Sequence, residues 1–174
     1  MKLETNRLIL RDFTPEDFSL LHEILSDAET MKHYPHPFQP EDTKNWIKRN
    51  RTRYATDGFG LWAVELKETG KLIGDCGITM QNIHGNLVPE IGYHINKKYQ
   101  KQGYATEAAA ACMKYAFQEL GFPKIYSYMK YTNEASARVA IKNGMQFVEK
   151  YEDAVNTITK VYAISRHEWE ETLA

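Results

Sequence analysis

The segment 87–131 constrains the fold more than any other part of this 174-residue chain. An apolar strand pattern over 87–96 is followed by a helix pattern over 104–120 and a second strand pattern over 125–131. The helix pattern stops at Gly121, which is followed closely by a proline. A strand, a helix and a strand at this spacing form a βαβ crossover, so the two strands are expected to be parallel.

The segments around this crossover predict further strands and helices. Strand patterns cover 8–13, 61–66, 72–80, 147–151 and 158–165, and helix patterns cover 14–25, 41–54, 133–143 and 167–173. The strands between 61 and 96 are joined by turns too short for a crossover helix, so they are expected to be antiparallel. The sequence therefore predicts a mixed α/β (α+β) fold with a mostly antiparallel sheet and helices on both faces.

Composition excludes several classes of protein. Hydrophobic residues make up 43% and charged residues 26%, which is ordinary for a globular chain, and one domain over 1–174 is expected. The net charge of −1 argues against a nucleic-acid partner. No run approaches ~18 apolar residues and no signal peptide is visible, so we expect a cytoplasmic protein without membrane contact. Cys76 and Cys112 lack CxxC spacing and no histidine pair has helical spacing, so no metal is expected.

The stretch 99–108 joins the first strand of the crossover to its helix. The first amides of a helix have no partner within it and lie at the positive end of its dipole, where phosphates bind. Gly103 permits close backbone approach to such an anion. Three lysines precede it with no acid among them, namely Lys97, Lys98 and Lys101. We therefore predict a local phosphate site, the alternative being an ordinary turn with solvated lysines.

Four motifs stand in order along the chain. Gln100-x-x-Gly103-x-Ala105 is similar to the pyrophosphate-binding signature of the GNAT superfamily of acyl-CoA-dependent N-acetyltransferases. Three further motifs resemble the branch that acetylates ribosomal-protein N-termini: Thr5-x-Arg7-Leu8-x-Leu10-Arg11, Glu90-Ile91-Gly92-Tyr93-His94-Ile95 and Asn133-x-x-Ser136-x-x-Val139-x-x-Lys142-x-Gly144. The resemblance covers nearly the whole chain. It implies a GNAT-like sheet whose central parallel strands splay apart.

The resemblance also implies acetyl-CoA as cofactor, with CoA as product. Backbone amides of 102–106 would hold the pyrophosphate, and the pantetheine arm would run between the splayed strands. The implied cofactor-binding residues are Tyr93, His94, Ile95, Gln100, Lys101, Gln102, Gly103, Tyr104, Ala105, Thr106, Asn133 and Ser136. Lys101 stands where many members have Gly, which adds charge near the phosphates. Asn133 also suits a helix N-cap, and the two roles are compatible.

The implied reaction is direct attack of an amine on the thioester within a ternary complex. Ala140 stands where many members carry a proton-donating Tyr, so Ser136 is implied as the hydrogen-bond donor to the departing sulfur. Glu90 is the first candidate for the base and His94 the second. Strand alternation puts both on one face. A surface ion pair for Glu90 and a structural role for His94 remain open as alternatives.

The acceptor is expected to be a primary amine, and the resemblance points to a protein N-terminal α-amine. An α-amine has a pKa near 8 and lysine one near 10.4, so the α-amine needs less help to lose its proton. The Pro-rich loop 33–40 and the first two helices are the expected walls of the acceptor site. A small amine (a polyamine, amino sugar or antibiotic) or a CoA-binding regulatory module without turnover are the alternatives. Family behaviour implies a homodimer through the C-terminal strands.

Overall fold

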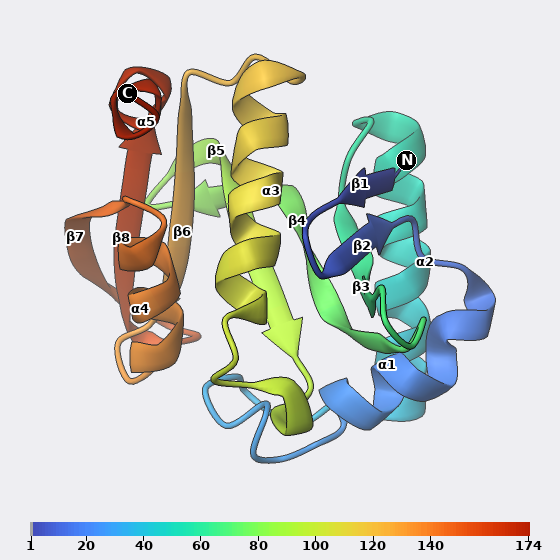
Figure 1. Ribbon diagram of the computed structural model, residues 1–174. Coiled ribbons are helices and arrows are strands. Elements are labelled where there is room, and N and C mark those ends of the chain that lie inside the picture. Colours follow the sequence, from blue (N-terminus) through green and yellow to red (C-terminus); the bar gives the residue numbers. More distant parts are fainter. Residues whose placement is uncertain (1) are drawn as a thin grey trace.

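The computed structural model describes residues 2–174, and Met1 lies outside the described residues. The βαβ crossover forms the centre of the molecule, as predicted (Figure 1). Strand β5 (Asn86–Ile95) and strand β6 (Lys124–Lys130) are parallel neighbours, and helix α3 (Tyr104–Gln118) connects them. This pair anchors the rest of the sheet on both sides.

All other neighbouring strands of the eight-stranded sheet are antiparallel, in the order β1-β2-β3-β4-β5-β6-β8-β7. Their bounds are β1 Lys2–Glu4, β2 Leu8–Arg11, β3 Leu61–Leu66, β4 Leu72–Ile83, β7 Gln146–Asp153 and β8 Thr157–Ser165. The mixed, mostly antiparallel fold is therefore confirmed. The sequence did not predict β1, because a three-residue edge strand gives no readable alternation.

The helices cover both faces of the sheet, as predicted (Figure 1). Their bounds are α1 Phe18–Leu25, α2 Pro40–Thr56, α4 Glu134–Lys142 and α5 Arg166–Thr172, with short 3₁₀ turns η1 (Pro15–Asp17) and η2 (Lys97–Tyr99). No helix within residues 2–174 has both the length and the apolar character needed to cross a membrane.

Alternating side chains of β3 belong to two separate hydrophobic cores. Trp62 and Val64 point into the larger core under α3, whereas Leu61 and Ala63 point into the core under α1 and α2. Because successive strand residues face opposite sides, a strand that is apolar throughout is buried on both faces. This double burial explains why helices cover the sheet on each side.

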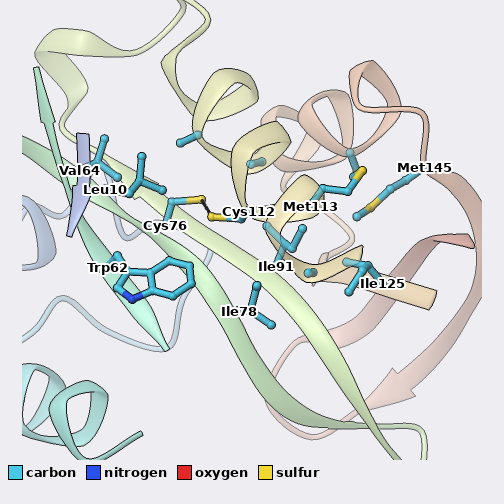
Figure 2. Close-up of a cluster of buried hydrophobic side chains, with 14 of the residues drawn as sticks. Leu10, Trp62, Val64, Cys76, Ile78, Ile91, Cys112, Met113, Ile125 and Met145 are labelled. Carbon is cyan, nitrogen blue, oxygen red and sulfur yellow. Dashed lines mark hydrogen bonds between the residues drawn. The ribbon is translucent and has the colours of Figure 1, made fainter. Parts of the chain in front are cut away.

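Helix α3 packs a line of small side chains against the sheet. Ala108, Cys112 and Ala116 are fully buried and recur at helical spacing. Figure 2 shows Cys112 directly beside Cys76 of β4, and their Sγ atoms are 3.7 Å apart. The loop before α3 follows directly on the carboxyl end of β5.

Candidate active site

Strands β5 and β6 separate toward their carboxyl ends. Their only bridge within the described residues joins Glu90 to Tyr126. Just beyond it, Ser127 Oγ donates a hydrogen bond to the Ile91 carbonyl at 3.3 Å. From there β5 continues to Ile95 without pairing to β6, which is the predicted splay.

The backbone groups of Tyr93 and Ile95 face the opening between the strands. The His94 carbonyl points the other way, toward β4, since a Cβ built on Gly74 would lie 2.1 Å from it. Successive residues of a strand direct their backbone groups to opposite sides, and the Ile91 carbonyl points to β6. Tyr93 therefore presents its N–H and carbonyl to the splay.

The loop before α3 has a fixed shape that suits an anion. Lys101 and Gly103 both have positive φ, 62° and 84°, and the Gln100 side chain donates to the Ile95 carbonyl at 2.9 Å. The first backbone bond of α3 runs from Glu107 N to Gly103 O at 3.0 Å. The amides of 104–106 thus precede the helical ladder, and a pyrophosphate fits there. Gln100 thus shapes this loop through its side chain.

Two of the three lysines of the predicted basic patch are paired with acids from an earlier segment of the chain. Lys97 Nζ lies 2.9 Å from Asp27 Oδ1, and Lys98 Nζ lies 3.8 Å from Glu23 Oε1. Both acids belong to α1 or the turn after it, about seventy residues earlier in the chain. The hydrogen bond from Lys97 is the main cause that lowers the pKa of Asp27 to about 2. Among residues 2–174, Lys101 alone of the three has no ion pair.

The start of α4 meets the splay from the α3 side of the sheet. Asn133 Oδ1 accepts a hydrogen bond from Ser136 N at 3.1 Å, which confirms its role as N-cap. The Tyr93 hydroxyl lies 3.0 Å from Ser136 Oγ and donates to the Ser136 carbonyl at 2.9 Å. Burial raises the pKa of Tyr93, so its hydroxyl stays protonated. The sequence did not reveal this tyrosine–serine pair, because its members lie 43 positions apart.

Glu90 and His94 share the opposite face of β5, as strand alternation predicted. A Cβ built on Gly92, between them, would lie 3.3 Å from Glu90 Oε1. Glu90 is 7% exposed, and its Oε2 accepts a hydrogen bond from Tyr128 N at 3.4 Å. Burial raises the pKa of Glu90 well above its ordinary value. The alternative of a surface ion pair for Glu90 is therefore wrong.

His94 belongs to a buried polar chain that crosses three elements. Its Nδ1 lies 2.9 Å from Asp75 Oδ1 on β4, and Asp75 Oδ2 accepts from Trp46 Nε1 on α2 at 3.0 Å. Asp75 is fully buried. Sequence reasoning missed Asp75 and Trp46, although a single acid inside the otherwise apolar 72–80 pattern was an available signal.

The loop 33–40 lies beside this chain, where an acceptor wall was predicted. The Tyr34 ring centroid is 5.1 Å from that of His94, and Phe38 packs edge-on against Trp46. His33 Nδ1 lies 2.9 Å from Thr132 Oγ1, next to the α4 N-cap. Burial first, and then the charges of Asp75 and other groups, raise the pKa of Tyr34. The α1–α2 face of β5 is thus polar and aromatic.

Known proteins resemble the chain over most of its length. Residues 7–146 match the family model described as the acetyltransferase (GNAT) domain. YkkB of Bacillus subtilis (strain 168) is 37% identical over 147 residues, which cover 84% of this chain and 86% of that protein. A crystal structure of a GNAT-family acetyltransferase from Bacillus anthracis has a TM-score of 0.81 at 31% identity, covering 96% of this chain and 99% of that one.

A further solved structure shares the fold at lower identity. RimL, a ribosomal L7/L12 α-N-protein acetyltransferase in complex with coenzyme A, has a TM-score of 0.79 at 16% identity and covers 95% of this chain and 98% of that one. The matched model spans most of the chain, and the splayed strands and anion loop fit acetyl-CoA. The chain therefore belongs to the GNAT family of acetyltransferases and uses acetyl-CoA as its acetyl donor.

Proposed function

We propose that this N-acetyltransferase acts on the α-amine of a protein or peptide N-terminus. The observation that carries the proposal is the buried side-chain pair Glu90 and His94 on the face of β5 opposite the α3 side. An α-amine with a pKa near 8 needs less help to lose its proton than a lysine near 10.4, which suits a site whose candidate bases are one carboxylate and one imidazole. Acetyl-CoA supplies the acetyl group as a thioester.

The cofactor is held chiefly by backbone. The amides of 102–106 bind the pyrophosphate. Lys101 adds the side-chain charge of its cluster that no carboxylate within residues 2–174 neutralises. Tyr93 and Ile95 pair through their backbone with the pantetheine arm, and a backbone N–H of β5 polarises the thioester carbonyl. Asn133 contacts the same arm from the start of α4.

Ser136 supplies the hydrogen bond that the departing sulfur needs. Its hydroxyl sits at the first turn of α4, and Tyr93 lies within 3.0 Å of it. Tyr93 does not protonate the thiolate, because its hydroxyl donates to the Ser136 carbonyl and burial raises its pKa. The Ser136 hydroxyl solvates the thiolate by hydrogen bonding. A thiol has a pKa of about 8.5, so solvation suffices for departure near neutral pH.

The acceptor amine must lose a proton before it attacks. On the acceptor side this task falls to Glu90 or His94. The raised pKa of Glu90 makes it a stronger base once ionised and lowers its ionised fraction at neutral pH. The substitutions Glu90→Gln and His94→Asn separate the two candidates by their effect on turnover.

A panel of amines tests the acceptor class. The protein is incubated with acetyl-CoA and one acceptor at a time, and the release of free thiol is measured. The acceptors are peptides with a free α-amine, the same peptides with a blocked α-amine and a free lysine, spermidine, and glucosamine. Turnover confined to free α-amines supports the proposal. Turnover confined to the small amines overturns it and makes the protein a small-molecule acetyltransferase, whereas CoA binding without thiol release on any amine makes it a regulatory module.

The homodimer remains part of this proposal. Strand β7 lies at the edge of the sheet and exposes Phe147 (52%) and Val148 (46%). An unpaired edge with apolar side chains is a surface on which a second copy can add its own strand. Light scattering of the wild type and of Val148→Lys measures whether two copies associate there.

A further inference from the structure

We propose that Asp75 and His94 form a catalytic dyad in which His94 Nε2 takes the proton of the acceptor amine. In this dyad Asp75 and Trp46 are positioning residues. The inference rests on the proposed function, because it assigns the deprotonation step that any amine acceptor requires. It follows from how the hydrogen bonds of the imidazole are arranged.

The contact with Asp75 sets the tautomer of His94. A carboxylate only accepts hydrogen bonds, so the 2.9 Å contact requires the proton on Nδ1. The lone pair of the neutral ring is then on Nε2. Within residues 2–174, Nε2 is buried and has no hydrogen-bond partner from the protein. A buried lone pair without a protein partner, beside the predicted acceptor wall, is placed to accept a proton from a ligand.

Asp75 is itself held from the other side. Its Oδ2 accepts from Trp46 Nε1 at 3.0 Å, so both carboxylate oxygens are bonded and the side chain has no exposed surface. The Trp46 ring also packs edge-on against His94 at a centroid distance of 5.9 Å. The indole therefore fixes the carboxylate and the imidazole together, and connects α2 to the reacting side of β5.

His94 takes one proton from the acceptor amine before the acetyl group is transferred. An ammonium N–H bond breaks, an Nε2–H bond forms on His94, and the electron pair stays on the amine nitrogen. That pair forms the C–N bond while the C–S bond breaks, and the sulfur leaves with its electrons toward Ser136 as a thiolate. The nitrogen, now bonded to the acetyl carbon and still carrying two hydrogens, loses one of them as a proton to solvent, which leaves a neutral amide. The imidazolium formed on His94 is stabilised by the adjacent Asp75 charge and then releases its proton to solvent.

Few titratable groups face the imidazole. They are Asp75 from β4, Tyr34 from the loop 33–40 and Glu90 from the same face of β5, while α2 contributes the uncharged Trp46. Burial keeps Tyr34 protonated and favours the neutral form of Glu90. Among the described residues, Asp75 is consequently the one charged group bonded to the ring.

The test is the substitution Asp75→Asn. An asparagine satisfies Trp46 with its oxygen and then offers an N–H to Nδ1, which moves the ring proton to Nε2. We expect kcat to fall about 100-fold or more, as for loss of a general base, with CoA affinity within about twofold. The loss should shrink at high pH, where the amine is already neutral. Nitrogen-15 NMR of labelled histidine should show the inverted tautomer directly.

Glu149→Gln is the matched control. Glu149 Oε1 contacts His84 Nδ1 at 2.6 Å in an exposed histidine–carboxylate pair, and this variant should keep wild-type turnover. The assay uses whichever amine the wild type acetylates, so a small-molecule acceptor would end the N-terminal proposal and leave this test intact. A proton on Nε2 in the wild type overturns the dyad, as does an Asp75→Asn kcat within threefold of wild type. The wild-type NMR measurement applies even if Asp75→Asn does not fold.

Discussion

Arg7 and Glu107 stand 100 positions apart and are joined by a 2.8 Å hydrogen bond from Nε to Oε1. The backbone N of Arg7 donates to the second carboxylate oxygen at 2.9 Å, and its Nη1 donates to the Gln102 carbonyl at 3.0 Å. The guanidinium also lies 4.2 Å from the centre of the Tyr104 ring. The segment before β2 thus supports the anion loop on both sides of Gly103.

Arg7→Met should therefore weaken cofactor use. Losing a hydrogen bond worth about 1 kcal/mol in the loop corresponds to roughly a fivefold rise in KM for acetyl-CoA, with kcat little changed. Initial rates measured over a range of acetyl-CoA concentrations give KM and kcat for the variant. Arg166→Met is the control, since Arg166 makes the same 2.8 Å contact to Glu170 on the surface of α5. Equal KM values for both variants would remove Arg7 from the support of the loop.

Gly103→Trp should abolish CoA binding and leave the fold intact. The position has φ +84°, and even a Cβ would lie 3.3 Å from Arg7 Nη2, so an indole must displace the loop or fill the anion site. Isothermal titration with CoA measures the loss. Gly70→Trp, at a positive-φ turn with open space around it, should bind CoA normally. Unchanged affinity in Gly103→Trp would refute the phosphate-loop assignment.

Lys101→Gly should change stability and cofactor affinity in opposite directions. Lys101 has φ +62°, a conformation that disfavours side chains, so glycine should stabilise the fold by about 0.5–1 kcal/mol after its greater unfolded-state freedom is counted. Loss of the charge should raise KM for acetyl-CoA severalfold. Urea unfolding and steady-state rates measure the two effects. A KM at or below the wild-type value would show that Lys101 does not bind the phosphates.

Ser136→Ala should lower turnover by more than it weakens CoA binding. The hydroxyl solvates the sulfur as the C–S bond breaks, an interaction stronger in the transition state than in the ground state. Tyr93→Phe removes the partner hydroxyl 3.0 Å away and should cause a smaller drop of the same kind. Rates and CoA affinity are compared for both variants. An unchanged rate in Ser136→Ala would exclude it from the mechanism.

Glu90→Gln should stabilise the protein increasingly as pH rises. The pKa of Glu90 is raised in the fold by burial, so its contribution to stability is fully present below the unfolded value near 4.5 and is lost as pH rises through the folded value. Each pH unit of that window corresponds to about 1.4 kcal/mol. Urea unfolding of both proteins at pH 4.5 and pH 7.5 measures the difference. A difference that does not grow with pH would contradict the burial of an ionisable group there.

Features set by neighbouring residues were predictable from sequence. The crossover, the antiparallel strands, the start of α3 at Gly103 and the shared face of Glu90 and His94 all follow from periodicity and glycine chemistry over a few positions. The edge strand β1 was missed because three residues carry too little pattern.

Features set by distant partners were not predictable in this way. The pairing of Lys97 with Asp27 depends on where α1 packs, and the contact of Tyr93 with Ser136 depends on the placement of α4. The bond of His94 to Asp75 depends on the β4–β5 register, which sets those two residues opposite each other. A single sequence shows which residues are able to form such contacts, but it does not show which residue each of them will meet in the fold.

The alternation along β5 separates two kinds of recognition on one strand. On our assignment, backbone N–H and carbonyl groups of the strand bind acetyl-CoA, and nearly every residue type can supply these groups. The side chains of Glu90 and His94 contact the acceptor amine. Substitutions at those positions can thus redirect the choice of amine during evolution without altering the donor contacts. Relatives that share this strand can diverge in the amine that they acetylate while all of them keep acetyl-CoA as the acetyl donor.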